Sequence, residues 1–114
     1  MKSLVILRLS ERSDLAKIQS LEAPEADRVW ELYEAGVLIE IYLFADMSGA
    51  VILLDTETEA EAAEAIESLP MVREKVLTPD IRPMTVWPEM CRMLSEKGMP
   101  DPEWWPRQRQ GENQ

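Results

Sequence analysis

Histidine is absent from this 114-residue chain, and cysteine occurs once, at Cys91. Without histidine, the chain lacks the commonest general base, every Ser–His or Cys–His nucleophile, and the imidazole ligands of zinc and haem iron. A single cysteine cannot form an internal disulfide, so we expect a reducing, cytoplasmic compartment. Cys91 also lacks an activating histidine, so a catalytic thiolate is not expected. Any chemistry must therefore rest on carboxylates, phenols and arginines.

Basic residues and long apolar runs are also scarce. Twelve Lys and Arg residues against 22 Asp and Glu residues give a net charge of −10. This charge disfavours nucleic acid and anionic membrane surfaces, because phosphate neutralisation requires clustered cations. No apolar run approaches the roughly 20 residues that span a bilayer. Glycine-rich phosphate loops are missing, and the acidic residues after Asp55 match no metal-ligand spacing. We therefore expect no cofactor and no metal.

The apolar pattern predicts a strand, a helix, two strands, a second helix and a last strand. The expected ranges are, in chain order, 3–9, 24–35, 37–44, 50–55, 58–69 and 76–85. Pro24 is placed in the first turn of the first helix. Residues 10–21 are ambiguous, and a short helix carrying Leu15, Ile18 and Leu21 is one interpretation. The order is that of an α+β, ferredoxin-like fold with helices on one face of a four-stranded antiparallel sheet.

Local signals fix several ends of these elements. Gly36 follows the first helix, where a left-handed C-terminal cap is expected. Thr58 and Glu61 form a capping box that starts the second helix. Pro79 and Pro83 each remove a ladder donor, so the last strand is predicted to lie at a sheet edge or to contain an irregularity.

The second and third strands indicate which sheet face needs a partner. In the second strand, strict alternation places two sets on opposite faces: Val37, Ile39, Ile41 and Leu43 under the helices, and Leu38, Glu40, Tyr42 and Phe44 on the face without helices. The third strand, residues 50–55, is apolar almost throughout, which is typical of a strand buried on both faces. We therefore expect a homodimer that covers the open sheet face.

The C-terminal segment differs from the rest of the chain. We divide the sequence into a domain over residues 1–87 and an arm over residues 88–114. The arm is predicted to hold a helix over 88–97, the pair Trp104–Trp105 among prolines, and a disordered end over 107–114. Two interpretations of the tryptophan pair stay open: an arm that docks on its own subunit or on the dimer mate, and a lid over a pocket.

Several short blocks resemble a known family. They are the segments 30–36 (WELYEAG), 39–42 (IEIY), 49–51 (GAV) and 68–71 (SLPM), followed by Pro83 and Trp87–Pro88. Over about residues 24–87 the chain resembles the muconolactone isomerase-like group of the dimeric α/β-barrel superfamily. The resemblance implies two sheets closing a barrel across a two-fold axis, in a dimer or a larger ring. It also implies a small-molecule site between sheet and helices, and cofactor-free proton transfer on lactones.

Glu40 is the candidate general base. A carboxylate among apolar neighbours binds its proton more tightly, which suits proton abstraction beside a carbonyl. Tyr42, on the same predicted face, is the candidate partner of the substrate carbonyl. The alternatives are an edge carboxylate that pairs with Arg8 or Arg82, and a tyrosine that serves packing.

Five further residues are candidates for substrate binding: Arg8, Arg82, Trp30, Tyr33 and Phe44. The two arginines lie on strands that pair in a ferredoxin-like sheet, where they could jointly hold a carboxylate. Salt bridges to Glu40, Asp55 or Asp80 are the alternative. Trp30 and Tyr33 fit a core-facing helix stripe and, as a second interpretation, a pocket wall.

The leading functional hypothesis is a cofactor-independent isomerase or cyclase that transfers a proton on a lactone- or polyketide-like substrate. The alternative is a non-catalytic dimeric module that binds a small ligand or a protein. A cofactor-free monooxygenase of the same superfamily is less well supported, because it usually relies on a histidine, or on a tryptophan and an asparagine. This chain has no histidine, and its one asparagine is Asn113.

Overall fold

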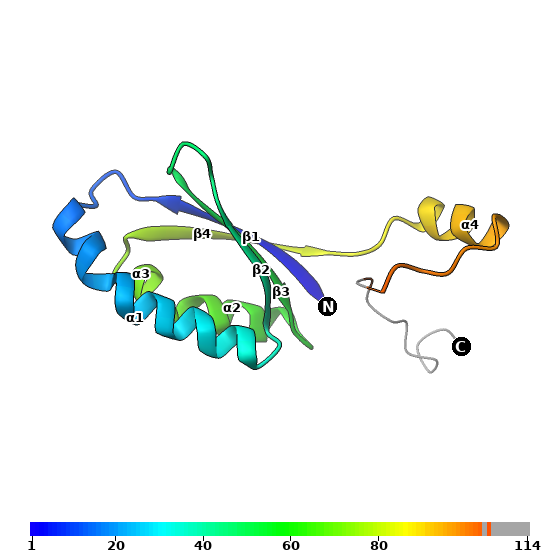
Figure 1. The fold of residues 1–114 in the computed structure, drawn as a ribbon, viewed down its shortest axis with the longest axis horizontal. Coiled ribbons are helices and arrows are strands. Elements are labelled where there is room, and N and C mark those ends of the chain that lie inside the picture. Colours follow the sequence, from blue (N-terminus) through cyan, green and yellow to red (C-terminus); the bar gives the residue numbers. More distant parts are fainter. Residues whose placement is uncertain (104, 106–114) are drawn as a thin grey trace. The chain divides into compact units, whose positions relative to one another are not determined.

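The computed structural model describes residues 1–103 and 105, in two compact units, Met1–Pro83 and Met84–Gln114. In chain order the elements are β1 (Lys2–Leu9), α1 (Leu15–Glu34), β2 (Leu38–Leu43), β3 (Gly49–Asp55), α2 (Glu59–Glu67), α3 (Pro70–Arg73), β4 (Leu77–Met84) and α4 (Pro88–Glu96) (Figure 1). The predicted βαββαβ order is confirmed. No helix in residues 1–103 is long and apolar enough to cross a membrane.

The four strands form one antiparallel sheet in the order β2-β3-β1-β4. Helices α1, α2 and α3 all lie on one face of this sheet (Figure 1). The edge position of β4 was predicted from its prolines, and it is confirmed. We call the face without helices the open face.

The first helix is longer than predicted. Residues 15–34 form one continuous helix with Pro24 in its interior, so the expected start near residue 24 is wrong. Asp14 caps the true start by accepting a hydrogen bond from Lys17 N at 2.7 Å. The Lys17 ammonium in turn donates to Glu74 O at 3.1 Å. These contacts stabilise the first turns, and Pro24 removes only one helical hydrogen bond.

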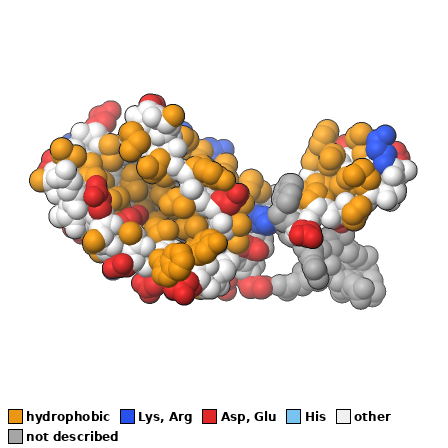
Figure 2. Space-filling model, viewed as in Figure 1, with side chains coloured by type: hydrophobic (Ala, Val, Ile, Leu, Met, Phe, Trp, Pro, Cys, Tyr) orange, Lys and Arg blue, Asp and Glu red, His pale blue; other side chains and the backbone are white. Residues whose placement is uncertain are grey.

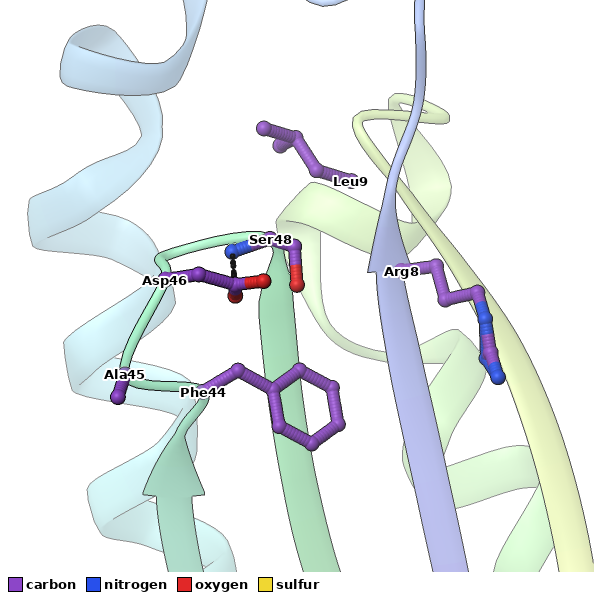
Figure 3. A pocket seen from close by; sticks show the side chains of 6 residues that line it. All are labelled: Arg8, Leu9, Phe44, Ala45, Asp46 and Ser48. Atoms are coloured by element: carbon purple, nitrogen blue, oxygen red, sulfur yellow. Dashed lines mark hydrogen bonds between the residues drawn. The ribbon is translucent and has the colours of Figure 1, made fainter.

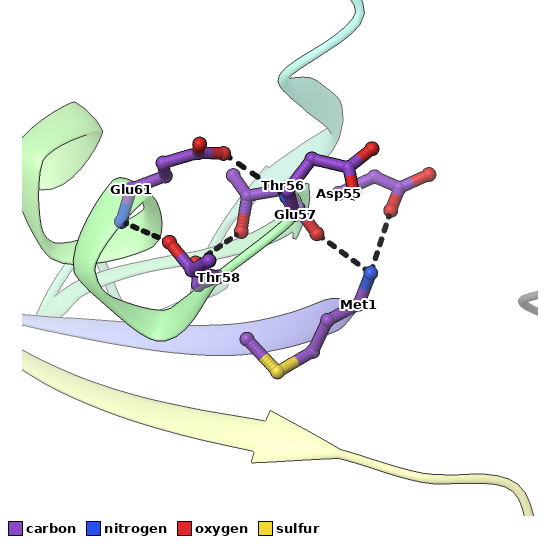
Figure 4. A network of polar contacts seen from close by, with 6 residues as sticks. All are labelled: Met1, Asp55, Thr56, Glu57, Thr58 and Glu61. Atoms are coloured by element: carbon purple, nitrogen blue, oxygen red, sulfur yellow. Dashed lines mark hydrogen bonds and ion pairs between the residues drawn. The ribbon is translucent and has the colours of Figure 1, made fainter. Parts of the chain in front are cut away.

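The second helix begins as predicted. Thr58 is its N-cap and accepts from Glu61 N at 3.1 Å, while the Glu61 carboxylate accepts from Glu57 N at 3.0 Å (Figure 4). In the same network the Met1 amino group donates to Thr56 O (Figure 4). The prediction missed α3, because Pro70 does more than end α2. Its fixed φ is suited to the first position of a helix, and a second short helix starts there.

A β-bulge in β2 overturns part of the predicted alternation. Leu38 lies opposite Leu54, but Glu40 lies opposite Leu53, so two residues of β2 span one step of β3. Leu38 therefore points to the helices and is buried, not exposed on the open face as predicted. Strict alternation fails here because the extra residue reverses the facing of everything before it.

The core lies between the helices and the sheet. It is formed by buried apolar side chains from the strands and from the helices: Val5, Leu7, Leu32, Leu38, Ala50, Ile52, Leu54, Ala62, Ala65, Ile66 and Leu69. Burial of such side chains contributes roughly 1.5–3 kcal/mol each for the larger ones. This core fixes the orientation of the open face on the other side of the same strands.

Ser3 is the one polar side chain fully buried within the described core. Its hydroxyl has no hydrogen-bond partner among residues 1–103 and 105. A buried, unpaired hydroxyl costs about 1–3 kcal/mol. We expect Ser3→Ala to raise the free energy of unfolding by about 1 kcal/mol in urea titrations, with an unchanged m-value. Ser20→Ala, which removes an exposed hydroxyl, is the control, and an equal gain there would contradict this explanation.

Glu25 joins α1 to the start of α3. Its carboxylate accepts a hydrogen bond from Met71 N at 2.9 Å, in a half-buried position. Partial burial raises the pKa of Glu25 above its ordinary value, and the Met71 hydrogen bond opposes this shift. Nearby, Arg28 Nε donates to Ser68 Oγ at 2.8 Å. The two contacts attach α1 to the α2–α3 junction.

We expect two substitutions at Glu25 to separate these effects. Glu25→Gln keeps an acceptor for Met71 N and removes the desolvated charge, whereas Glu25→Ala loses the cap and should cost about 1 kcal/mol. A raised carboxyl pKa stabilises the fold at low pH, and that contribution is lost as pH rises through the folded-state pKa. The stability of Glu25→Gln relative to the unmodified chain should therefore increase between about pH 4 and pH 7. If urea titrations gave the same stability difference between the two proteins at every pH, this explanation would be contradicted.

The second unit contains α4, predicted over 88–97 and found over Pro88–Glu96. Its polar face carries Arg92, which pairs with Glu89 at 2.9 Å and with Glu96 at 2.7 Å. Leu94 is buried, and hydrophobic side chains gather over this helix in Figure 2. Trp104 and the predicted disordered end lie outside the described residues, so the interpretations of the arm stay predictions.

Candidate functional site

The centre of the open face is apolar. Leu4 and Ile6 of β1 lie opposite Leu53 and Val51 of β3, and all four are only partly exposed. Strand β2 adds polar groups at one margin, since Glu40 lies opposite Leu53 and Tyr42 opposite Val51. The open face is therefore an apolar patch with a carboxylate and a phenol along one side.

Glu40 and Tyr42 form a hydrogen-bonded pair on this face. The Tyr42 hydroxyl donates to Glu40 Oε1 at 2.9 Å. The hydrogen bond to Glu40 and its negative charge both raise the pKa of the Tyr42 phenol, so this group is a hydrogen-bond donor at neutral pH. Both side chains are exposed in the single chain, so the desolvated surroundings predicted for Glu40 are not present there.

Arg8 and Phe44 line a hollow at one end of the open face. The hollow has a volume of about 700 Å³ and is formed by the end of β1 and the β2–β3 turn. Its other lining residues are Leu9, Ala45, Asp46 and Ser48 (Figure 3). Asp46 accepts a hydrogen bond from Ser48 N at 3.0 Å, and hydrogen bonding from Ser48 lowers the pKa of Asp46. The hollow thus contains one cation, one anion and one aromatic ring.

Trp30 and Tyr33 lie on the helix side of the sheet. Their rings stack with centroids 5.5 Å apart, and both side chains are more than half exposed. Ile41 and Leu43 point to the same side but are 43% and 64% exposed, so they are not packed beneath α1 as predicted. In Figure 2 hydrophobic side chains gather over a hollowed area of this unit, where Figure 1 places α1 and the β2–β3 hairpin on either side.

Arg82 belongs to neither group. It forms an ion pair with Asp80 at 3.0 Å, which is one of the alternatives left open by the sequence. Ser10 N donates to Val76 O at 2.8 Å, so β4 starts beside the end of β1. Arg8 and Arg82 are then about four residue steps apart, roughly 13 Å along the strands. The structure does not bring the two arginines together around one carboxylate.

Comparison with known proteins identifies the family. A sequence profile of muconolactone delta-isomerase matches residues 4–90. The chain belongs to the muconolactone delta-isomerase family. No curated protein matches the chain.

Two solved structures show the fold of this family. The crystal structure of muconolactone isomerase at 3.3 Å resolution has a TM-score of 0.64 and 18% identity, covering 77% of this chain and 92% of the other. The dehydrochlorinase of 5-chloro-2-hydroxyhydroquinone from Burkholderia phenoliruptrix AC1100, in complex with 2,5-dihydroxybenzoquinone, has a TM-score of 0.62 and 15% identity, covering 78% and 98%. At these identities the likeness establishes the fold.

Membership of the muconolactone delta-isomerase family supports an isomerase- or lyase-type role on a small molecule. The sequence had selected Glu40, Tyr42, Arg8 and Phe44, which lie on or beside the open face. It missed Asp46, Ser48 and Gly49. A turn followed by a glycine that starts a strand is the signal that could have located this region, because glycine within a strand often marks a close approach of a neighbouring backbone.

Proposed function

We propose that this chain is a cofactor-independent isomerase or lyase that moves a proton on a small ring substrate bound at the open face. The observation that carries the proposal is the family match over residues 4–90, together with the hydrogen-bonded pair of Glu40 and Tyr42. A carboxylate and a phenol are sufficient for acid–base chemistry beside a carbonyl. The single Cys91 is in keeping with a reducing cytoplasm.

In the proposed reaction the Glu40 carboxylate removes a proton from a carbon next to the substrate carbonyl. The electron pair moves toward the carbonyl oxygen, and the Tyr42 hydroxyl donates a hydrogen bond to the resulting enolate. Protonated Glu40 then returns the proton to a different carbon of the ring, which isomerises it. In a lyase reaction the enolate instead expels a leaving group, which departs with its bonding electron pair, and Glu40 releases its proton to water. Tyr42 exchanges its present acceptor, Glu40, for the substrate oxygen.

The proposal includes a homodimer that covers the open face. In one chain Glu40 is exposed, whereas the apolar centre of the face offers Leu4, Ile6, Val51 and Leu53 to a second copy. Covering this surface would remove water from around Glu40. The Glu40 carboxylate would then bind a proton more tightly, as proton abstraction at neutral pH requires. Such dimers would assemble into a larger ring if other surfaces of the chain also pair.

We expect Leu53→Glu to weaken the dimer about a hundredfold or more, because it places an unpaired charge at the centre of an apolar interface. Sedimentation equilibrium over a range of protein concentrations measures this change. Leu15→Glu, at an exposed position of α1, is the control. An unchanged dimer in Leu53→Glu would place the interface elsewhere.

The function is tested by exchange and by binding. The chain would be incubated in D₂O with small lactones and hydroxylated quinones, and deuterium uptake at ring carbons followed by ¹H NMR. Stabilisation by each compound would be followed in parallel, since a ligand at a hundred times its Kd adds about 2.7 kcal/mol. Enzyme-dependent uptake supports the proposal. If compounds bind but none of them takes up deuterium, the proposal is overturned.

The alternative function is a dimeric module that binds a ligand without turnover. One observation favours it: Glu40 and Tyr42 are both exposed and already satisfy one another. Stabilisation by a ligand, with no exchange and no product, is the outcome that this alternative predicts.

A further inference from the structure

Gly49 lies in β3 between Arg8 and Phe44, two of the residues that line the hollow. Phe44 N donates to Gly49 O at 2.9 Å, and Gly49 is the register partner of Arg8. The three residues therefore form one row across β2, β3 and β1, with no side chain in the middle. Two strand spacings separate the outer residues by about 9.6 Å. In Figure 3 the Phe44 ring lies over β3, and the Arg8 side chain extends from β1 away from Phe44, so a ligand that contacts both side chains lies across β1.

Arg8 is available for an anion. Its guanidinium forms no hydrogen bond or ion pair with residues 1–103, as is also true of Arg12 and Arg73, whereas Arg28, Arg82 and Arg92 each have a carboxylate partner. A guanidinium presents parallel donors that match the two oxygens of a carboxylate. Arg8 is also the only cation among the residues that line the hollow. A ligand that enters this hollow is therefore selected for one negative charge.

Asp46 restricts the ligand further. The Ser48 amide holds this carboxylate at the hairpin end of the hollow, and it remains an acceptor at neutral pH. It would repel a second negative charge, which disfavours phosphates and dicarboxylates. A neutral lactone would leave Arg8 without a partner. The favoured ligand carries one carboxylate, a flat ring and a hydroxyl that donates to Asp46.

From this arrangement we infer that the hollow binds a hydroxylated aromatic monocarboxylate. Its carboxylate pairs with Arg8, its ring packs on Phe44, and its hydroxyl donates to Asp46. This inference goes beyond the proposed function, because an aromatic acid has no acidic hydrogen on a carbon beside its carbonyl and would occupy the hollow as a bound ligand. Tyr42 lies two residues before Phe44 in the chain and Glu40 lies four residues before it.

The inference is tested by calorimetric titration of the full chain with four probes: 3-hydroxybenzoate, 4-hydroxybenzoate, benzoate and phenol. We expect one of the hydroxybenzoates to bind most tightly. Benzoate should bind about tenfold more weakly, because it loses the hydrogen bond to the charged Asp46 carboxylate. Phenol should bind at least about tenfold more weakly, because hydrogen bonds to charged groups are worth about 1.5–3 kcal/mol. Equal affinity for phenol and the hydroxybenzoates would overturn the inference.

Variants locate the binding. Arg8→Gln should weaken hydroxybenzoate binding about tenfold or more, and Arg8→Lys should restore part of it, since lysine keeps the charge without the paired donors. Phe44→Leu should weaken it several-fold. Arg12→Gln removes an exposed cation outside the lining residues and is the matched control. Equal losses in Arg8→Gln and Arg12→Gln would show a general charge effect and no site.

The two proposals fail in different ways. If no compound undergoes exchange but the Arg8-dependent binding persists, the enzyme proposal is wrong and the hollow is a ligand site of another kind. If exchange occurs on other compounds and no hydroxybenzoate binds, the inferred ligand class is wrong and the proposed function stands.

Discussion

Glu40→Gln is expected to lower the rate of enzyme-dependent proton exchange by about 100-fold to 10,000-fold, the range contributed by a positioned general base. Glutamine has nearly the same shape and accepts a hydrogen bond from Tyr42, but it cannot take up a proton. Stability should change little, because Glu40 is exposed and its one described contact is with Tyr42. Exposed substitutions of this kind are usually within about 0.5 kcal/mol.

Deuterium uptake and thermal unfolding of the same preparations measure both effects. Glu64→Gln, which neutralises an exposed carboxylate of α2, is the matched control and should keep full activity. Tyr42→Phe should retain more activity than Glu40→Gln, because it removes a stabilising donor and leaves the base. A large loss of stability in Glu40→Gln would make Glu40 a structural residue, and unchanged exchange would remove it from the chemistry.

Gly49→Ala is expected to destabilise the fold by about 3 kcal/mol or more, among the larger effects of single substitutions. A β-carbon at this position would lie 2.0 Å from the carbonyl oxygen of Leu7 in the neighbouring strand. Backbone atoms on both sides would have to move, since Leu7 is buried in the core and Arg8 pairs with Gly49. The substitution therefore disrupts the central β1–β3 ladder.

Gly36→Ala gives the matched comparison. Gly36 has a φ of +76°, but an added β-carbon would meet nothing within 4 Å. Its cost is that of the left-handed backbone conformation, about 1–2 kcal/mol. Urea titrations should thus give Gly49→Ala a much lower free energy of unfolding than Gly36→Ala. Similar midpoints for the two variants would show that β1 and β3 separate easily at this point.

Most of the fold could be predicted from the sequence, because its signals are local. Thr58 and Glu61 mark a helix start through hydrogen bonds within one turn, and the prolines of β4 mark an edge by removing donors. The start of α1 could not be predicted in this way. Its cap, Asp14, is local, but Pro24 indicated a helix start nearby, and the sequence does not show that the helix continues through this proline.

The candidate site was only partly predictable for a related reason. The sequence selects residue types, so Glu40 and Tyr42 were found as a pair of neighbours on one strand. The union of Arg8, Phe44 and Asp46 depends on strand register and on a hairpin turn, which bring residues about 35 positions apart into one hollow. The separation of Arg8 from Arg82 depends on the register of β4 beside β1, which composition does not encode.

The bulge at Ile39 bears on how residue roles are carried between relatives. Where a protein of this family lacks the extra residue in its second strand, an alignment without a gap pairs residues that point to opposite faces on one side of this position. Aligning the two by sequence would then match a core leucine with a surface position, or Glu40 with a buried one. The presence or absence of the extra residue in this strand therefore decides whether the role of Glu40 can be transferred to a relative. In relatives that share the bulge, a carboxylate at this position has the same surroundings.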